Sequence, residues 1–143
     1  MEYFVSQCAS FNFRKAARVI TQLFDNALQP VGLRSTQLAV LLAAGINENA
    51  TMSQLAEIIV ADRTTLTRAL KPLFIKGYLK SVTGKDKRKT AITLTDKGHQ
   101  IILKSVPYWI KAQNRVVKSL GQKKWESLRI ALNKVSDKVK ENS

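Results

Sequence analysis

The middle of the chain carries a run of local signals that restricts the fold more than any other part of the sequence. Thr51 followed by Gln54 matches the capping-box pattern that begins a helix. Asp62 can cap a second helix over residues 63–76, and Gly77 suits the turn that ends it. Two short helices joined by a tight turn, with Thr and Arg abundant in the second, predict a helix-turn-helix.

The next segment predicts a β-hairpin with a basic tip. Residues 78–82 and 90–95 carry β-branched side chains with partial alternation, and residues 83–89 between them form a charged, Gly-containing turn. A helix-turn-helix followed at once by such a hairpin is the pattern of a winged helix, and the combination is far more specific than either part. The sequence therefore predicts a mainly α-helical chain with a small β-hairpin wing.

Amphipathic helical patterns flank the winged unit on both sides. Residues 11–28 carry apolar side chains at three- and four-residue spacing, and a strongly apolar helix capped by Ser35 or Thr36 follows. After the hairpin a long helix begins at residues 95–96, and the last helix, residues 122–140, carries an apolar a/d seam. Because these stripes lie at opposite ends of the sequence, we expect them to pack against a second subunit around a twofold axis. Packing within one chain is the alternative.

The charge balance indicates a polyanionic partner. The 143 residues include 24 Lys and Arg against 10 Asp and Glu, a formal net charge of +14. In the middle of the chain the excess lies on residues 63–71 and 85–89, whereas after residue 95 it is spread along helical patterns. A charge this far from zero favours binding of nucleic acid first and of an anionic membrane surface second. For the spread charges, a solvated helix face is the simpler interpretation.

The sequence also excludes several classes of protein. One Cys cannot form an internal disulfide, which fits a reducing cytoplasm, and one His with one Cys leaves out the usual zinc sites. The longest apolar stretches, such as residues 38–46, fall short of the roughly 20 residues that span a bilayer. No secretory leader, catalytic Ser/His/Asp or Cys/His group, or Gly-rich phosphate loop is recognisable. We therefore expect a cytoplasmic protein that is not an enzyme, with no cofactor, no metal and no membrane partner.

Helix periodicity separates a core face from a DNA-binding face on the second helix of the helix-turn-helix. At about 100° per residue, Leu66, Leu70 and Leu73 fall on one side with Ala69. The opposite side carries Arg68, a candidate for bidentate pairing with guanine, and Lys71, a candidate phosphate contact. The predicted DNA-contact residues are Ser53, Arg63, Thr64, Thr65, Thr67, Arg68 and Lys71 in the helix-turn-helix, and Lys85, Lys87, Arg88 and Lys89 in the wing.

Taken together, these segments resemble the MarR family of winged helix-turn-helix transcriptional regulators over nearly the whole chain. The most specific marks are Asp86-Lys87-Arg88 in the wing and the L-T-x-x-G pattern of residues 94–98. The segments PVGLRSTQLAVLLA and SQLAEIIVADRTTLTRALKPLFIKGYL carry the rest, and the DRTTLTR stretch with the later Pro-Tyr-Trp resembles one subgroup. The resemblance implies one domain over residues 1–143, with dimerisation helices in 1–34 and 96–143 around a DNA-binding unit in 35–95.

The wing and the twofold axis determine how such a protein would engage DNA. Arg88 at the wing tip suits a narrow A·T-rich minor groove, and Asp86 is expected to stabilise Arg88 or the turn, as the resemblance also implies. A twofold dimer separates two recognition helices by about 34 Å, one turn of DNA. We therefore expect a homodimer bound to double-stranded DNA with a palindromic or pseudopalindromic operator. The alternative for the wing residues is a merely solvated hairpin.

Two inputs are candidates for control of DNA binding. The first is a small aromatic anion in a cleft, implied by the resemblance, that the residues Phe11, Phe13, Arg14, Tyr108 and Trp109 line in part, although aromatic residues of this kind also occur in cores. The second is oxidation of Cys8, just ahead of the first helix, where a helix N-terminus lowers a thiol pKa. Against oxidation, a lone Cys is often only a small packed hydrophobe.

The sequence thus favours a sequence-specific DNA-binding transcriptional regulator, a repressor released by a small ligand or by thiol oxidation. The alternative is a constitutive architectural protein whose +14 charge dominates largely non-specific binding. A sharp preference for one palindrome in the presence of competitor DNA would favour the specific regulator over the architectural protein.

Overall fold

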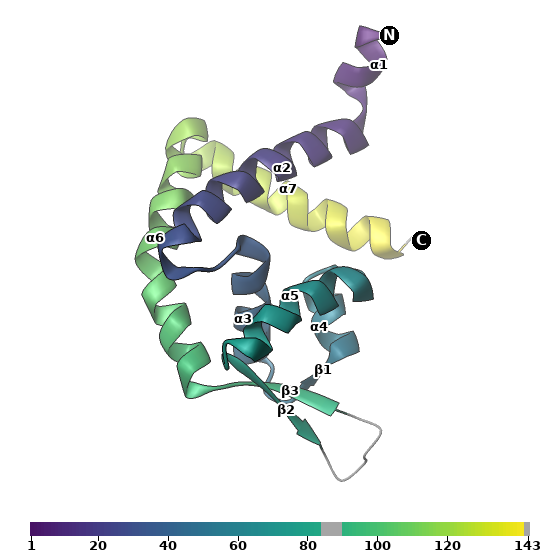
Figure 1. Cartoon of the computed structure of the whole chain (residues 1–143). Helices are drawn as coiled ribbons and strands as arrows, with labels where there is room; N and C mark the ends of the chain where they lie inside the picture. The colour runs from purple at the N-terminus through teal and green to yellow at the C-terminus, as the bar shows by residue number, and fades with distance from the viewer. Residues whose placement is uncertain (84–89, 142–143) are drawn as a thin grey trace. The chain divides into compact units, whose positions relative to one another are not determined.

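A computed structural model describes residues 1–83 and 90–141 of the chain. It divides into two compact units, Met1–Trp109 and Ile110–Ser143. In the first unit (Figure 1), helices precede and follow a small sheet. Its elements are α1 (Glu2–Gln7), α2 (Ala9–Leu28), the short 3₁₀ helix η1 (Gln29–Val31), α3 (Ser35–Ile46), β1 (Ala50–Thr51), α4 (Met52–Ile58), α5 (Arg63–Ile75), β2 (Leu79–Thr83), β3 (Thr90–Leu94) and the first part of α6 (Asp96–Leu120).

The sheet confirms the predicted hairpin and adds a strand. Strands β2 and β3 pair antiparallel, with Leu79 opposite Leu94 and Val82 opposite Ala91. The two residues of β1 pair with the other edge of β3, with Ala50 opposite Ile92, so that the strand order is β1-β3-β2. The predicted fold class, mainly α-helical with a small β-hairpin wing on a helix-turn-helix, is confirmed, but β1 was not predicted because two residues are too short to show alternation.

Leucines from α3, α4 and α5 form the core of the first unit together with the inner faces of β2 and β3. Burying a leucine side chain stabilises a fold by roughly 1.5–3 kcal/mol, so this cluster holds the three helices and the sheet together. The largest fully buried side chains in it are Leu28, Val40, Leu41, Leu55, Leu66, Leu70 and Leu73.

A carboxylate from α2 caps α3, and this corrects one prediction. Ser35 does not cap the helix with its own hydroxyl, and neither does Thr36, because Arg34 occupies the N-cap position. Instead, the main-chain N–H and the hydroxyl of Ser35 both donate to Asp25 Oδ1 at 2.7 Å. A carboxylate binds helix N-terminal donors more strongly than a neutral hydroxyl does. This contact ties the end of α2 to the start of the winged unit.

The turn between α4 and α5 holds a strained residue. The Val60 N–H donates to Glu57 O at 3.2 Å and the Ala61 N–H to Ala56 O at 2.9 Å, which is the Schellman pattern that ends many helices. Val60 takes the left-handed position of this motif, with φ of 52°, where glycine is usual. A β-branched residue at positive φ is a genuine outlier. The helix-turn-helix therefore forms at a local conformational cost.

Replacing Val60 with glycine should stabilise the protein. The left-handed conformation costs a residue with a Cβ about 1–2 kcal/mol, and the larger entropy of an unfolded glycine offsets about 0.4–1 kcal/mol of that gain. Because the Val60 side chain is 66% exposed, little burial is lost. We expect urea unfolding of Val60→Gly to show a net gain of about 0.5–1 kcal/mol. Val60→Ala removes most of the same side chain but keeps the Cβ, so an equal gain there would rule out backbone strain as the cause.

The second unit is a helical hairpin. The last turns of α6 lead to Gly121, whose φ of 85° permits the turn into α7 (Gln122–Glu141). The predicted last helix is therefore confirmed. Of its predicted a/d seam, Trp125 and Leu132 are half-buried, whereas Leu128 and Val135 are exposed. None of these four seam residues is fully buried in the single chain, and the side chain of Val139, the fifth predicted seam residue, lies outside the described part.

Candidate nucleic-acid interface

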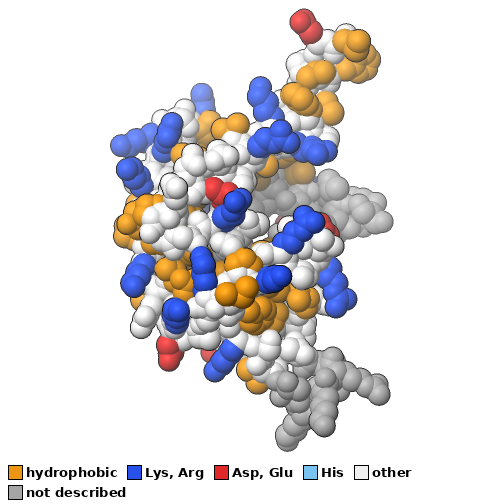
Figure 2. Space-filling view, viewed as in Figure 1, with side chains coloured by type: hydrophobic (Ala, Val, Ile, Leu, Met, Phe, Trp, Pro, Cys, Tyr) orange, Lys and Arg blue, Asp and Glu red, His pale blue; other side chains and the backbone are white. Residues whose placement is uncertain are grey.

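Core packing fixes the outward face of α5. Leu66 and Leu73 are completely buried and Leu70 nearly so, whereas Thr64, Thr67, Arg68 and Lys71 are exposed on the other side, as the periodicity predicts. Arg63 and Thr65 in the first turn are exposed as well. The space-filling view shows many Lys and Arg and few Asp and Glu side chains on the visible face (Figure 2). The outward side of α5 thus presents cations and hydroxyls on a rigid support.

The first turn of α5 is organised by Asp62, the predicted cap. Asp62 Oδ1 accepts from the Thr65 N–H at 2.8 Å, and Oδ2 accepts from the Thr65 hydroxyl at 2.9 Å. The Thr67 hydroxyl donates to Arg63 O at 2.8 Å. The hydroxyls of Thr65 and Thr67 therefore already donate hydrogen bonds within the chain. Their methyl groups remain available to contact an outside partner.

The carboxylate of Asp62 should make helix stability depend on pH. The Thr65 N–H, and secondly the Thr65 hydroxyl, hold the pKa of Asp62 below its ordinary value of 3.8. Because the pKa of Asp62 is lower in the folded state than in the unfolded state, the stability that its carboxylate contributes is fully present above pH 3.8. That stability is lost as the pH falls through the lowered folded-state pKa. We expect the stability difference between wild type and Asp62→Asn, measured by urea unfolding, to shrink across that acidic window. A difference that does not change with pH would show that the charge of Asp62 has no role.

The start of α4 confirms the predicted capping box. Thr51 Oγ1 accepts from the Gln54 N–H at 3.3 Å, and the Thr51 N–H donates to Gln54 Oε1 at 2.8 Å. Ser53 is exposed in the first turn of this helix. The structure therefore presents Ser53 at a helix N-terminus, a position suited to phosphate contacts.

The predicted wing is described only in part. Its strands β2 and β3 are in place, and β2 carries the exposed Lys80, a cation that was not among the predicted DNA-contact residues. Strand alternation offered a signal for Lys80, because its neighbour Leu79 is buried. The predicted tip residues Lys85, Asp86, Lys87, Arg88 and Lys89 lie outside the described residues.

The aromatic residues predicted to line a ligand cleft lie in different surroundings. Phe11, Phe13 and Arg14 are exposed on α2. Tyr108 is half-buried against the core, and the Trp109 ring lies 6.5 Å from that of Phe24. An apolar hollow of about 510 Å³ contains Phe11 but not the other four; it is lined by Met1, Glu2, Val5, Ser6, Phe11, Asn12 and Lys15.

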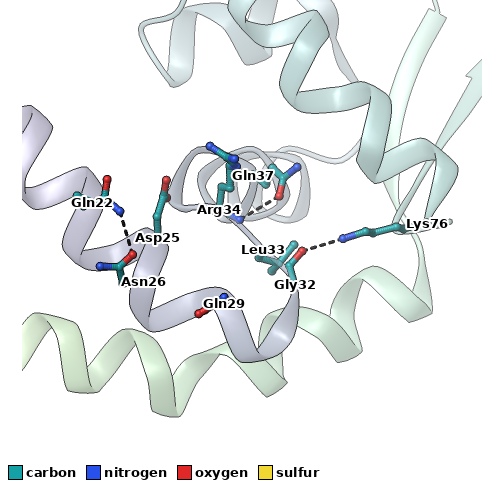
Figure 3. A pocket seen from close by; sticks show the side chains of 9 residues that line it. All are labelled: Gln22, Asp25, Asn26, Gln29, Gly32, Leu33, Arg34, Gln37 and Lys76. Atoms are coloured by element: carbon teal, nitrogen blue, oxygen red, sulfur yellow. Dashed lines mark hydrogen bonds between the residues drawn. The ribbon is translucent and has the colours of Figure 1, made fainter.

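A larger polar hollow lies where α2, α3 and the end of α5 approach one another (Figure 3). Its volume is about 560 Å³, and none of the predicted cleft residues lines it. Two hydrogen bonds join residues that line this hollow. Lys76 Nζ donates to Gly32 O at 2.7 Å, and the Arg34 N–H donates to Gln37 Oε1 at 2.9 Å. Its lining residues are Gln22, Asp25, Asn26, Gln29, Gly32, Leu33, Arg34, Gln37 and Lys76.

Cys8 lies at the N-cap of α2, close to its predicted place. Its side chain is exposed, and Sγ accepts from the Phe11 N–H at 3.5 Å. Within residues 1–83 and 90–141, no group of three or more His, Cys, Asp and Glu side chains is arranged to hold a metal ion. Over the same ranges, no helix has both the length and the apolar character needed to cross a membrane.

Comparisons with known proteins place this geometry in context. No family model matches the chain. The transcriptional regulator MosR of M. tuberculosis, crystallised in complex with DNA, is 36% identical to it, with a TM-score of 0.84 over 94% of this chain and 98% of that one. The HTH-type transcriptional regulator SarZ of Staphylococcus saprophyticus is 34% identical over 92 residues, 64% of this chain and 63% of SarZ.

A third comparison extends the likeness in fold. A mutant of MarR from E. coli, complexed with operator DNA, is 22% identical and has a TM-score of 0.83 over 92% of this chain and 96% of that one. MosR and SarZ are transcriptional regulators, which are not enzymes.

Proposed function

This chain belongs to the MarR family of winged helix-turn-helix transcriptional regulators, and we propose that it regulates transcription by binding a specific double-stranded DNA site through α5 and the wing. The observation that supports this most directly is the outward face of α5, where Arg68 and Lys71 are exposed opposite a fully buried leucine face. A rigid helix that presents cations and methyl groups suits the major groove. MosR and MarR were both crystallised with DNA.

The exposed polar residues of α5 have the following parts in this proposal. Arg68 pairs bidentately with a guanine, and Lys71 and Ser53 contact phosphates. Because the hydroxyl protons of Thr65 and Thr67 are bound by Asp62 and by a main-chain carbonyl, their methyl groups contact thymine methyls. Arg63 and Thr64, and Lys85, Lys87, Arg88 and Lys89 of the wing, which Asp86 stabilises, complete the proposed contacts.

The protein binds as a homodimer in this proposal, with residues 1–34 and 96–143 forming the platform around the DNA-binding unit of residues 35–95. Uncovered apolar surface supports it: Phe13 on α2 is 45% exposed and Leu128 on α7 is 41% exposed. A second copy would cover such stripes around a twofold axis. The DNA site is then palindromic or pseudopalindromic, with half-sites about 34 Å apart. Sedimentation of the purified chain tests the oligomeric state.

Selection from a random duplex pool tests the function itself. We expect the purified chain to enrich one palindrome, and gel shifts with the enriched duplex to resist excess random competitor. Enrichment of no sequence, with binding that competitor DNA removes in proportion to its mass, would indicate the architectural alternative and contradict sequence-specific regulation.

Control of binding is the finer part of the proposal: the protein is a repressor, released by a small aromatic anion or by oxidation of Cys8. The hollow beside Phe11 supports the first input, because it combines apolar walls with the cation Lys15, the combination that an aromatic anion requires. The other four residues predicted for this effector, Phe13, Arg14, Tyr108 and Trp109, do not line this hollow. The second input is supported by an exposed thiol at the N-cap of a 20-residue helix.

The two inputs are separable by mutation. If oxidation releases the DNA, peroxide should abolish the gel shift of wild type and leave that of Cys8→Ser unchanged. If an aromatic anion releases it, Lys15→Gln should bind DNA as wild type does but require a higher concentration of salicylate-like probe for release. Insensitivity of wild type to both treatments would eliminate both inputs.

A further inference from the structure

The polar hollow between α2, α3 and the end of α5 is built from side chains that form hydrogen bonds. Among the described residues that line it, Leu33 is apolar and Gly32 has no side chain, whereas the other seven carry amide or charged groups. Its volume of about 560 Å³ lies within the size range of small-molecule sites. All of the lining residues belong to the first unit. Walls of this kind suit a polar ligand.

Hydrogen bonds hold two walls of the hollow in place. Asp25 Oδ1 accepts the N–H and the hydroxyl of Ser35, each at 2.7 Å, and so joins α2 to the start of α3. Lys76 Nζ donates to Gly32 O at 2.7 Å and joins the end of α5 to the turn after η1 (Figure 3). The hollow therefore exists before a ligand arrives, and this lowers the entropic cost of binding.

The positive charge of the hollow exceeds its negative charge. Arg34 and Lys76 are cations on its wall, and Asp25 is the acid. The Arg34 guanidinium has no hydrogen-bond or ion-pair partner among residues 1–83 and 90–141. The Asp25 carboxylate, in contrast, already accepts the two donors of Ser35. The charge of Arg34 is therefore available to an anion.

The amide groups on the same walls add further donors. Gln37 Oε1 accepts from the Arg34 N–H, so the NH₂ group of this amide is left to donate. Asn26 Oδ1 accepts from Gln22 Nε2 at 2.9 Å, which leaves the NH₂ group of Asn26 in the same state. Lys76 keeps two N–H donors beside the one that it uses. Donors and positive charge together select an anion with several acceptor oxygens.

The hollow lies on the side of α2 that a second copy would leave open. At about 100° per residue, the four residues of α2 that line it share an arc of about 100°. The exposed apolar side chains of Phe13 and Ile20 centre about 180° from that arc. A second copy that covers Phe13 and Ile20 therefore approaches the opposite side of α2.

We propose that this hollow binds a small aliphatic anion that carries two or three carboxylates. The Arg34 guanidinium pairs with one carboxylate through two parallel hydrogen bonds, and Lys76 binds another from the end of α5. The NH₂ groups of Asn26 and Gln37 donate to the remaining oxygens. This ligand differs from the aromatic anion proposed for the hollow beside Phe11, because the polar walls offer little surface for a ring to pack against.

Isothermal titration calorimetry of the full chain tests the proposal without DNA. The probes are citrate, acetate and inorganic phosphate, each at neutral pH and at the same ionic strength, so that screening of exposed charges is equal. We expect citrate to bind at least about 10-fold more tightly than acetate or phosphate, because its additional carboxylates reach more of the donors. Citrate binding no tighter than that of the two smaller anions would overturn the proposed class of ligand.

Two matched double variants locate the site. Arg34→Gln with Lys76→Gln removes both cations of the hollow, whereas Arg18→Gln with Lys104→Gln removes the same residue types from exposed positions that do not line it. We expect the first pair to weaken citrate binding at least about 30-fold and the second to change it less than about 2-fold. Equal losses in both would show that net charge alone attracts citrate, and this would overturn the proposal.

Arg34→Gln alone keeps the test valid if the double variant folds poorly. Lys76→Gln also removes the hydrogen bond to Gly32 O, whereas the Arg34 guanidinium holds no other described residue. Arg34→Gln should therefore unfold in urea as wild type does and bind citrate at least about 10-fold more weakly. Unchanged affinity in this variant would contradict the proposed site. Because no DNA is present, each of these results is independent of whether the chain reads a specific sequence.

Discussion

Replacing Gly98 with alanine should lower the free energy of unfolding by about 3 kcal/mol. A Cβ at this position would overlap the main-chain carbonyl oxygen of Tyr78 and come within 2.6 Å of Leu94 Cδ1. The carbonyl cannot retreat freely, because it accepts from the Thr95 N–H at 3.1 Å. Relief of the overlap would therefore disrupt the junction at which β3 turns into α6.

Gly45→Ala is the matched control for this change. Gly45 also lies in a helix and near Leu94, but a Cβ there would meet only the Cδ2 methyl at 3.2 Å. A methyl at the end of a side chain can shift, and alanine favours the helix by about 1 kcal/mol over glycine. We expect urea unfolding of Gly45→Ala to stay within about 1 kcal/mol of wild type. A loss at Gly98 no larger than this would show that the Tyr78 carbonyl can move at little cost.

The L-T-x-x-G pattern shows why sequence alone gives only part of such an explanation. The cap was predictable locally, and Thr95 Oγ1 indeed accepts from the Gly98 N–H at 3.0 Å. The requirement for glycine at position 98 was not predictable locally, because the carbonyl that would obstruct a Cβ belongs to Tyr78, twenty residues earlier in the chain. The same hydroxyl donates to Gly77 O at 2.7 Å, a second contact that joins the helix start to the end of α5.

Other successes and errors divide in the same way. The caps of Thr51 and Asp62 were predicted because their partners lie three residues away. The cap of α3 was not, because Asp25 reaches it from another helix. The positive φ of Val60 was not predictable either, since its side chain favours extended backbone and the turn between packed helices overrides that preference.

For the candidate site, periodicity predicted the direction of α5 side chains but not their hydrogen bonds. Leucines at 66, 70 and 73 must be buried, and this fixes the exposure of Arg68. That the hydroxyl of Thr67 donates to the carbonyl of Arg63 follows only from the structure. The hollows likewise depend on how helices meet, so their lining residues could not be selected from a single helical pattern.

Loss of the Arg68 side chain should weaken binding of the enriched duplex by about 1–3 kcal/mol, roughly 5- to 150-fold, and relax the base preference at one position of each half-site. The reason is geometric: a guanidinium donates two parallel hydrogen bonds to guanine O6 and N7 and to no other base pair equally well. Because Arg68 is exposed on a helix whose other face is packed, Arg68→Ala should leave unfolding by urea nearly unchanged.

Two further variants separate charge from geometry at this position. Lys71→Ala should weaken enriched and random duplexes alike and make the salt slope shallower by about 1, since a phosphate contact does not read sequence. Arg68→Lys keeps the positive charge but not the planar pair of donors. It should therefore retain the salt slope of wild type while losing most of the base preference. If Arg68→Ala and Lys71→Ala reduced binding of both duplexes equally, the assignment of base reading to Arg68 would be wrong, because no difference between the two side chains would remain except position.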